Sequence, residues 1–188
     1  IRGEQMKISK DTIKWLTEEE GFKSNLPHKK GEIPERLTSY DDSAGNLTTG
    51  FGTVVSRSKD PKQRQIDVES FTKKTGVDPH DVKREDAYRL QQEHIEKETI
   101  PHIESSLGEE VWNRIDPKVQ TQMVDTVYNT GFLGPKLTAK TKQAVASGTK
   151  ADWNTVADEL ENWHGGKAPE QAKGVLERRK RNADAVRA

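Results

Sequence analysis

The sequence predicts an α+β protein that is dominated by helix, with one small antiparallel sheet near the N-terminus. Two observations support this prediction. Apolar residues recur at three- and four-residue spacing along most of the chain that follows Val55. That pattern is replaced by Thr, Ser and Gly among scattered apolar residues only over 37–55. A chain of 188 residues fits one domain, or two lobes that share a connecting helix.

The composition excludes several classes of protein. Lys and Arg number 31, as do Asp and Glu, so the chain lacks the positive field of a nucleic-acid-binding protein. There is no cysteine, which excludes disulfides, thiolate chemistry and cysteine metal sites. No apolar run approaches the roughly 20 residues that span a bilayer. The start at Ile1 carries neither a signal peptide nor an initiator Met, so we expect a fragment of something longer.

The N-terminal third alternates helix, loop and sheet. Ser9 is placed to cap a helix with an apolar face, and Gly21 is its natural end. Residues 23–36 are rich in Pro, Gly and Lys and predict a surface loop. Residues 37–55, with turns at 41–45 and 50–52, predict the only sheet of the protein.

The rest of the chain predicts helices. A short helix containing Val68 and Phe71 ends at Gly76. A longer helix is expected from about Arg84 to Ser106, and Pro101 should kink or break it near its end. Further helices are expected from Asp116–Pro117 to Gly131 and around 137–147, 153–163 and 169–186.

The predicted hairpin is the first candidate for chemistry. Asp42 and Thr48 are six residues apart, so a carboxylate and a hydroxyl can face each other across a tight turn. Glycines at 45, 50 and 52 permit turns and the close approach of a ligand to the backbone. An ordinary turn, in which Asp42 only accepts hydrogen bonds from nearby backbone N–H groups, remains the alternative.

A family resemblance strengthens the catalytic interpretation. The residues that carry it are Glu20-Gly21-Phe22, followed by Tyr40, Asp42, Gly45, Thr48 and Gly50-Phe51-Gly52. This pattern resembles the phage-type lysozymes of glycoside hydrolase family 24, and helical similarity extends it from about Ser9 to Ala185. The resemblance implies a single two-lobed catalytic domain over 1–188. Its expected parts are an N-lobe of about 9–83, a connecting helix of about 84–106 and a C-lobe of about 107–188.

The resemblance also implies the roles of three residues, since the family's Glu/Asp/Thr triad corresponds to Glu20, Asp42 and Thr48. Cleavage of a glycosidic bond requires an acid that protonates the leaving oxygen, and Glu20 is the expected acid. Asp42 would deprotonate a water that Thr48 orients, which corresponds to an inverting mechanism. No cofactor or metal is needed.

An insertion of about a dozen residues separates Gly21 from Tyr40, relative to the compact family pattern. Glu32 and Glu35 fall inside it and are alternative acids, but neither follows an apolar helical stripe. We expect the insertion to be a surface loop, with a lip over the cleft or a partner-binding loop as alternatives.

Substrate contacts follow from the resemblance with less support. Val54 matches an apolar cleft position, and Tyr128 and Asn129 match an aromatic residue and an amide at the cleft floor. For Tyr128, a place in the core is an equal alternative. Gln171 stands where the T-even type has an arginine near the acid, which leaves Arg178 and Arg179 as candidates for that role.

Two other features are expected to be inert. His94 and His102 are eight residues apart on one predicted helix, but no third metal ligand is evident, so we interpret both as surface residues. The basic run from Arg178 to Arg181 is interpreted as a solvated helix face.

We therefore expect a monomeric muramidase that cleaves the β-1,4 bond between N-acetylmuramic acid and N-acetylglucosamine in the cell wall. The alternatives are a non-catalytic peptidoglycan-binding module of the same fold and a hydrolase of chitin or chitosan oligomers. A phage lysin and a secreted antibacterial effector are equally compatible settings, and an effector would have a cognate immunity protein. The export route is left open.

Overall fold

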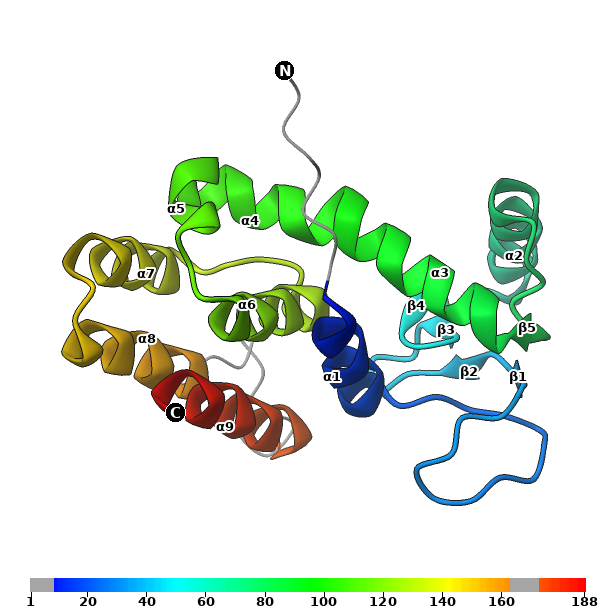
Figure 1. Cartoon of the computed structure of the whole chain (residues 1–188). Coiled ribbons are helices and arrows are strands. Elements are labelled where there is room, and N and C mark those ends of the chain that lie inside the picture. Colours follow the sequence, from blue (N-terminus) through cyan, green and yellow to red (C-terminus); the bar gives the residue numbers. More distant parts are fainter. Residues whose placement is uncertain (1–8, 163–172) are drawn as a thin grey trace. The chain divides into compact units, whose positions relative to one another are not determined.

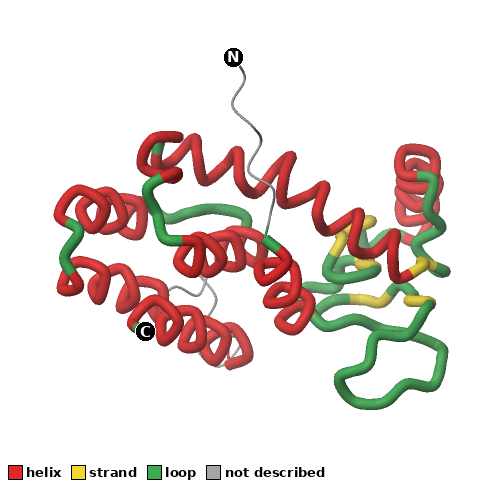
Figure 2. The backbone as a smooth tube through the Cα atoms, viewed as in Figure 1, coloured by secondary structure: helices red, strands yellow, loops and turns green. Residues whose placement is uncertain are grey.

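The computed structural model describes residues 9–162 and 173–188, and helices make up most of that part (Figures 1 and 2). The remaining elements are short antiparallel strands, all of them within the first 83 residues. The predicted α+β class is confirmed. The chain divides into two compact units. Leu16–His94 forms the strand unit, and Ile95–Ala188 together with the chain up to Trp15 forms the helical unit.

The first helix, α1 (Lys10–Glu20), begins and ends where the sequence predicts. The hydroxyl of Ser9 accepts a hydrogen bond from the backbone N–H of Thr12 at 3.1 Å, which caps the helix. Gly21 follows with φ at 67°, a left-handed conformation that glycine adopts without strain and that ends the helix. Glu20 is therefore the last helical residue.

Two small sheets lie in the strand unit. In the first, β2 (Tyr40–Asp41), β3 (Leu47–Thr49) and β4 (Thr53–Ser56) pair antiparallel in that order. In the second, β1 (Arg36–Leu37) pairs antiparallel with β5 (Val82–Lys83). The expectation of a single sheet over 37–55 was therefore wrong. The missed strand is two residues long and pairs far away in sequence, so it has no local periodicity to reveal it.

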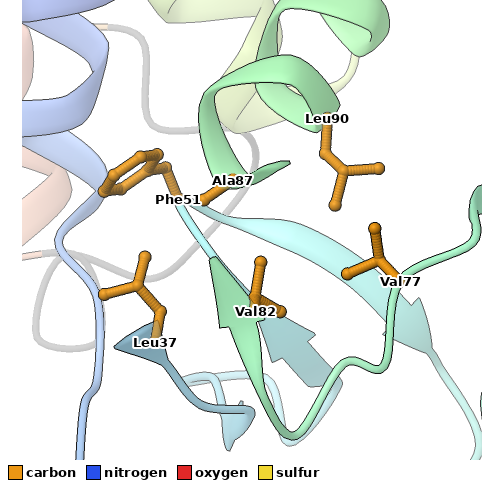
Figure 3. Packing of buried hydrophobic residues seen from close by; sticks show 6 residues of the cluster. All are labelled: Leu37, Phe51, Val77, Val82, Ala87 and Leu90. Carbon is orange, nitrogen blue, oxygen red and sulfur yellow. The ribbon is translucent and has the colours of Figure 1, made fainter. Parts of the chain in front are cut away.

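A compact apolar cluster joins these strands to α3 (Arg84–His94) (Figure 3). Ala87 and Leu90 of α3 extend toward the strands, where Phe51 and Val82 are fully buried. The cluster consists of Leu37, Phe51, Val77, Val82, Ala87 and Leu90. Phe51 also packs against the ring of Tyr88, with centroids 4.8 Å apart. Because Phe51 lies between two turn glycines, its burial anchors the second hairpin to α3.

The helix α2 (Pro61–Thr75) packs against β4, and none of its side chains is fully buried. Gly76 ends it with φ at 72°, as predicted, but the helix is 15 residues long rather than short, and its cap at Asp60, which accepts from backbone N–H groups, was not predicted. The preceding 23–36 segment is a largely exposed loop, also as predicted. Its ends are fixed, because Lys23 bridges to Thr38 and the half-buried Ile33 packs against the apolar cluster.

The expected long helix consists of three consecutive segments. The helix α3 is followed by a π-helical turn, η1 (Ile95–Thr99), and then by α4 (Ile100–Leu107). Pro101 was expected to kink or break the helix near its end, but the irregularity comes before the proline and the helix continues past it. A wider turn upstream accommodates a residue that has no N–H and whose ring crowds the preceding turn.

In the helical unit, α6 (Pro117–Thr130) is the central helix, and it lies between α4 and α9 (Lys173–Arg187) (Figure 1). Asp116 caps it and Gly131 ends it, as predicted. The other helices of this unit pack on its neighbours: α5 (Glu109–Asn113), which was not expected, contacts α4, α7 (Pro135–Ser147) contacts α4 and α8 (Lys150–Asn162), and α8 contacts α9. The expected contributions of Trp163 and Pro169 lie outside the described residues. Among the described helices, none is long and apolar enough to cross a membrane.

Candidate active site

Asp42 lies at the start of the turn between β2 and β3 and is surrounded by hydrogen-bond donors. Its Oδ1 accepts from the backbone N–H groups of Ala44 and Asn46, both at 2.9 Å. Its Oδ2 accepts from the Asn46 side-chain amide at 3.1 Å and from the Thr48 hydroxyl at 3.3 Å. The turn and the pairing with Thr48, which were alternatives in the sequence, occur together.

These contacts set the ionisation of Asp42. Partial burial raises the pKa of its carboxyl, but the hydrogen bonds from Asn46, Ala44 and Thr48 outweigh burial and hold the pKa below its ordinary value. Asp42 is therefore a stable carboxylate at neutral pH. Thr48 is 2% exposed and points its hydroxyl at that carboxylate from the facing strand.

Glu20 approaches the second hairpin of the same sheet. Gly52, in the turn between β3 and β4, has φ at 86°, and a Cβ atom placed there would lie 3.0 Å from Oε2 of Glu20. The same Cβ would lie 3.3 Å from Cδ of Glu20, so the carboxyl packs directly on the glycine backbone. Glycine is required here for its conformation and for the space that it leaves.

The phenol of Tyr40 on β2 interacts electrostatically with the carboxylates of Glu20 and Asp42. Burial raises the pKa of its phenol to about 12, and the negative charges of Glu20 and Asp42 add to the effect. On β2, Tyr40 pairs with Thr48 of β3, and the Nζ of Lys23 lies 5.7 Å from the centre of its ring. Glu20, Asp42 and Thr48 therefore belong to one neighbourhood within the strand unit.

Most of the chain, including Asp42 and Thr48, matches a known family. The family model described as phage lysozyme matches residues 34–182, which is well over half of the chain. The chain belongs to the phage lysozyme family. As a phage lysozyme it is a glycoside hydrolase, and its substrate is the peptidoglycan of the cell wall. No match was found among the curated proteins.

The range matched by the family model includes only two of the three residues of the expected triad. Asp42 and Thr48 lie inside it, whereas Glu20 and most of the 23–36 insertion precede it. The rival acids of the insertion, Glu32 and Glu35, are both exposed. Glu32 accepts a hydrogen bond from the backbone N–H of Lys29, which is a local turn contact. Only Glu20 of these three packs against the hairpin backbone.

The expected substrate contacts fall in both units of the lysozyme. Val54 in the strand unit is half-buried on β4 and pairs with Thr48 of β3. In the helical unit, Tyr128 is half-buried and Asn129 is exposed near the end of α6. The Oδ1 of Asn129 accepts a hydrogen bond from Nη2 of Arg179 at 2.7 Å. Since arginine can only donate, the NH₂ group of Asn129 must point the other way.

Behind Asn129 lies a buried polar network that was not predicted. Arg178 and Arg179 are 6% and 0% exposed, and both donate to the fully buried carboxylate of Asp125 on α6. Asn182 donates to the same carboxylate at 2.9 Å and accepts from Arg179 at 2.6 Å. The expectation of a solvated face was therefore wrong for these two arginines. Their anionic partner lies 53 residues or more away, which a local charge pattern cannot reveal.

The remaining candidates carry no chemistry that the structure supports. His102 is half-buried and its Nε2 accepts from the backbone N–H of Leu133 at 3.3 Å, so it is not a free surface residue as expected. His94 is also half-buried. Among the described residues, no group of three His, Asp or Glu side chains is placed to hold a metal. Gln171 lies outside the described residues.

Proposed function

We propose that the protein is an inverting muramidase in which Glu20 is the general acid, Asp42 the general base and Thr48 the residue that orients the attacking water. The bond cleaved joins C1 of N-acetylmuramic acid to O4 of N-acetylglucosamine. Glu20 gives its proton to O4 as the bond breaks. Water attacks C1 from the opposite face and passes a proton to Asp42.

The surroundings of Glu20 support its role as the acid. It is the last residue of α1, and the carboxyl end of a helix carries partial negative charge that favours an uncharged carboxyl there. Its carboxyl packs on the backbone of Gly52, where a sugar can approach closely because no side chain stands in the way.

The surroundings of Asp42 support its role as the base. Its lowered pKa keeps it ionised over the whole neutral range, which a base requires. The one hydroxyl proton of Thr48 has two acceptors within reach, Asp42 at 3.3 Å and the backbone oxygen of Asn46 at 3.4 Å, so the lone pairs of the Thr48 oxygen remain to accept a hydrogen bond from water. A water held by both residues is a directed nucleophile. The 3.3 Å contact between Asp42 and Thr48 is the observation that carries the proposal.

Three further residues are proposed to bind the glycan. Val54 offers an apolar surface next to Thr48, and Tyr128 offers an aromatic one on α6. Asn129 offers amide N–H donors, because Arg179 occupies its oxygen. Such donors suit acceptors on the substrate, among them the carbonyl oxygens of N-acetyl groups.

The direct experiment measures the release of reducing ends from purified peptidoglycan, chitin and chitosan. We expect release from peptidoglycan with muramic acid at the new reducing end, and an α-anomer as the first product. Asp42→Asn should lower the rate by about 10²–10⁴-fold. Asp81→Asn, an exposed carboxylate paired with Arg36, is the control that should keep the rate. Binding without release, or preferential cleavage of chitin, would overturn the proposal.

The biological setting that we propose is lysis of a bacterial cell wall, by a phage lysin or by a secreted antibacterial effector. In the effector setting a producing cell needs an inhibitor of this activity. Affinity capture from the producing strain should then return a protein that blocks the release of reducing ends from peptidoglycan. Capture of none would favour the lysin.

A further inference from the structure

Two cationic side chains bind backbone oxygens of the turn that carries Asp42. The Nζ of Lys59 donates to the carbonyl oxygen of Ala44 at 2.6 Å. The Nη2 of Arg64 donates to the carbonyl oxygen of Gly45 at 2.7 Å. Both residues lie beyond the sheet, in the segment between β4 and α2 and in α2 itself.

Arg64 connects three parts of the chain at once. Besides Gly45, it reaches the carbonyl oxygen of Ser58 through Nε at 2.7 Å and the carboxylate of Asp41 through Nη1 at 2.8 Å. The planar guanidinium fixes the directions of these bonds relative to one another, which a lysine cannot do. Because Arg64 lies one turn inside a helix capped by Asp60, its backbone is itself held in place.

The peptide between Gly45 and Asn46 transmits this contact to Asp42. Its oxygen accepts from Arg64, and its N–H donates to Oδ1 of Asp42 at 2.9 Å. A peptide unit is planar, so fixing the oxygen fixes the direction of the N–H on the other side. A cation at the oxygen also polarises the unit and strengthens the N–H as a donor.

The neighbouring peptide between Ala44 and Gly45 is held in the same way. Lys59 binds its oxygen, while its N–H donates to the backbone oxygen of Asp42 at 2.8 Å. The lysine passes so close that a Cβ at position 45 would overlap with Nζ where it now lies. Gly45 is therefore needed for this contact as well as for the turn, where its φ is 76°.

We propose that Arg64 and Lys59 are positioning residues for Asp42, which act through the two peptide units of the turn. Arg64 keeps the N–H of Asn46 aimed at the carboxyl of Asp42, and Lys59 keeps the N–H of Gly45 on the backbone oxygen of Asp42. They touch neither the carboxyl nor the water that it would activate. The inference deepens the proposed function, since it rests on Asp42 being the base. In this proposal α2 and the residues just before it hold the base in position.

The groups that face Asp42 directly would remain in a variant of either cation. They are the donors Ala44, Asn46 and Thr48, together with the phenol of Tyr40, whose pKa is raised by burial and, in addition, by Glu20 and Asp42. Loss of Arg64 should therefore weaken the donors without removing them. The pKa of Asp42 should rise toward its ordinary value. Since the base must be ionised, the acid limb of the pH–activity profile should shift to higher pH as well.

The test measures the pKa of Asp42 by NMR titration of its carboxyl carbon, beside kcat and KM on soluble peptidoglycan fragments. The variants are Arg64→Ala, Arg64→Lys and Lys59→Met. We expect a raised Asp42 pKa and a kcat lowered by roughly 10-fold or more in Arg64→Ala, with KM little changed. Lys59→Met should show a smaller change of the same sign. Arg64→Lys should restore only part of the kcat and of the Asp42 pKa shift, because an ammonium group lacks the planar set of donors of the guanidinium.

Arg89→Ala is the matched control. Like Arg64, Arg89 has three acceptors, here the carboxylates of Asp86 and Glu93 and the backbone oxygen of Thr75, but none of them belongs to the turn. It should lower stability without moving the pKa of Asp42. If Arg64→Ala does not fold, the exposed Lys59 decides the test. An unchanged Asp42 pKa in the folded variants, or an equal change in Arg89→Ala, would overturn the inference. The titration needs no turnover, so this result is independent of the proposed activity.

Discussion

Gly52 leaves open the space that a side chain would take from the carboxyl of Glu20, since a Cβ atom there would lie 3.0 Å from Oε2. Gly52→Ala should therefore displace Glu20 and also place alanine at a φ of 86°, a strain of roughly 1–2 kcal/mol. We expect a large loss of kcat together with a lower midpoint of urea unfolding.

Gly76 provides a control of the same kind. It ends α2 with φ at 72°, and a Cβ there would meet nothing within 4 Å. Gly76→Ala should lower stability by a similar amount and leave kcat unchanged. If both alanine variants lost activity equally, the contact between Gly52 and Glu20 would have no part in catalysis.

Tyr40 should be an internal probe of the two carboxylates. Its phenol has a pKa of about 12, which is raised from the ordinary 10.0 by burial, then by Glu20, then by Asp42. Absorbance of tyrosinate should show one of the three tyrosines ionising late, and Tyr40→Phe should remove that step. Glu20→Gln should lower the pKa of Tyr40 more than Asp42→Asn does. An unchanged pKa of Tyr40 in Glu20→Gln would show that the carboxylate of Glu20 does not act on the phenol.

The same pKa makes stability depend on alkaline pH. The folded protein favours the neutral phenol, so this contribution is complete below pH 10 and is lost as the pH rises toward about 12. The free energy of unfolding of Tyr40→Phe should fall less steeply over this range. Urea unfolding at several pH values measures the difference, and parallel curves for the two proteins would contradict it.

The orientation of Asn129 predicts a change in binding. Asn129→Asp keeps an oxygen for Arg179 but replaces the NH₂ donors with a second acceptor. We expect KM to rise by about 10-fold, the equivalent of one lost hydrogen bond, with kcat little changed. Asn113→Asp on the exposed surface of α5 is the control. If the two variants had the same KM, the amide of Asn129 would not bind the substrate.

The buried carboxylate of Asp125 should be essential for the stability of the helical unit. Asp125→Ala leaves Arg178 and Arg179 without their shared buried anion, and the expected loss is about 3–5 kcal/mol in urea unfolding. Asp158→Ala removes an exposed partner of Arg187 and should cost under about 1 kcal/mol. Similar losses in the two variants would show that the network adds nothing beyond a surface ion pair.

Features that depend on neighbours in sequence could be predicted. Ser9 and Gly21 mark the ends of α1, and Asp42 and Thr48 meet across one turn, because each relationship lies within a few residues. Features that join distant segments could not. Val82 pairs with Leu37, and Asp125 binds Arg178, across 45 and 53 residues respectively.

The misinterpreted arginines show why the second kind of feature is hidden. A run of basic residues on a helix is a solvated face unless an acidic residue elsewhere is buried against it. Asp125 lies among the apolar residues of α6 without any local sign that its carboxylate is paired. The positioning role proposed for Arg64 was hidden for the same reason, since its acceptors are backbone oxygens in another turn.

Turnover by Glu20→Gln tests the central claim most directly, with Glu32→Gln and Glu35→Gln as matched changes in the exposed insertion. The measurement is the initial rate of reducing-end release from purified peptidoglycan, with urea unfolding to confirm that each variant folds. We predict that Glu20→Gln loses at least about 10²-fold in rate and that both controls keep the rate of the parent protein. A folded Glu20→Gln protein with full activity, or a loss that appears in Glu32→Gln or Glu35→Gln instead, would contradict the account.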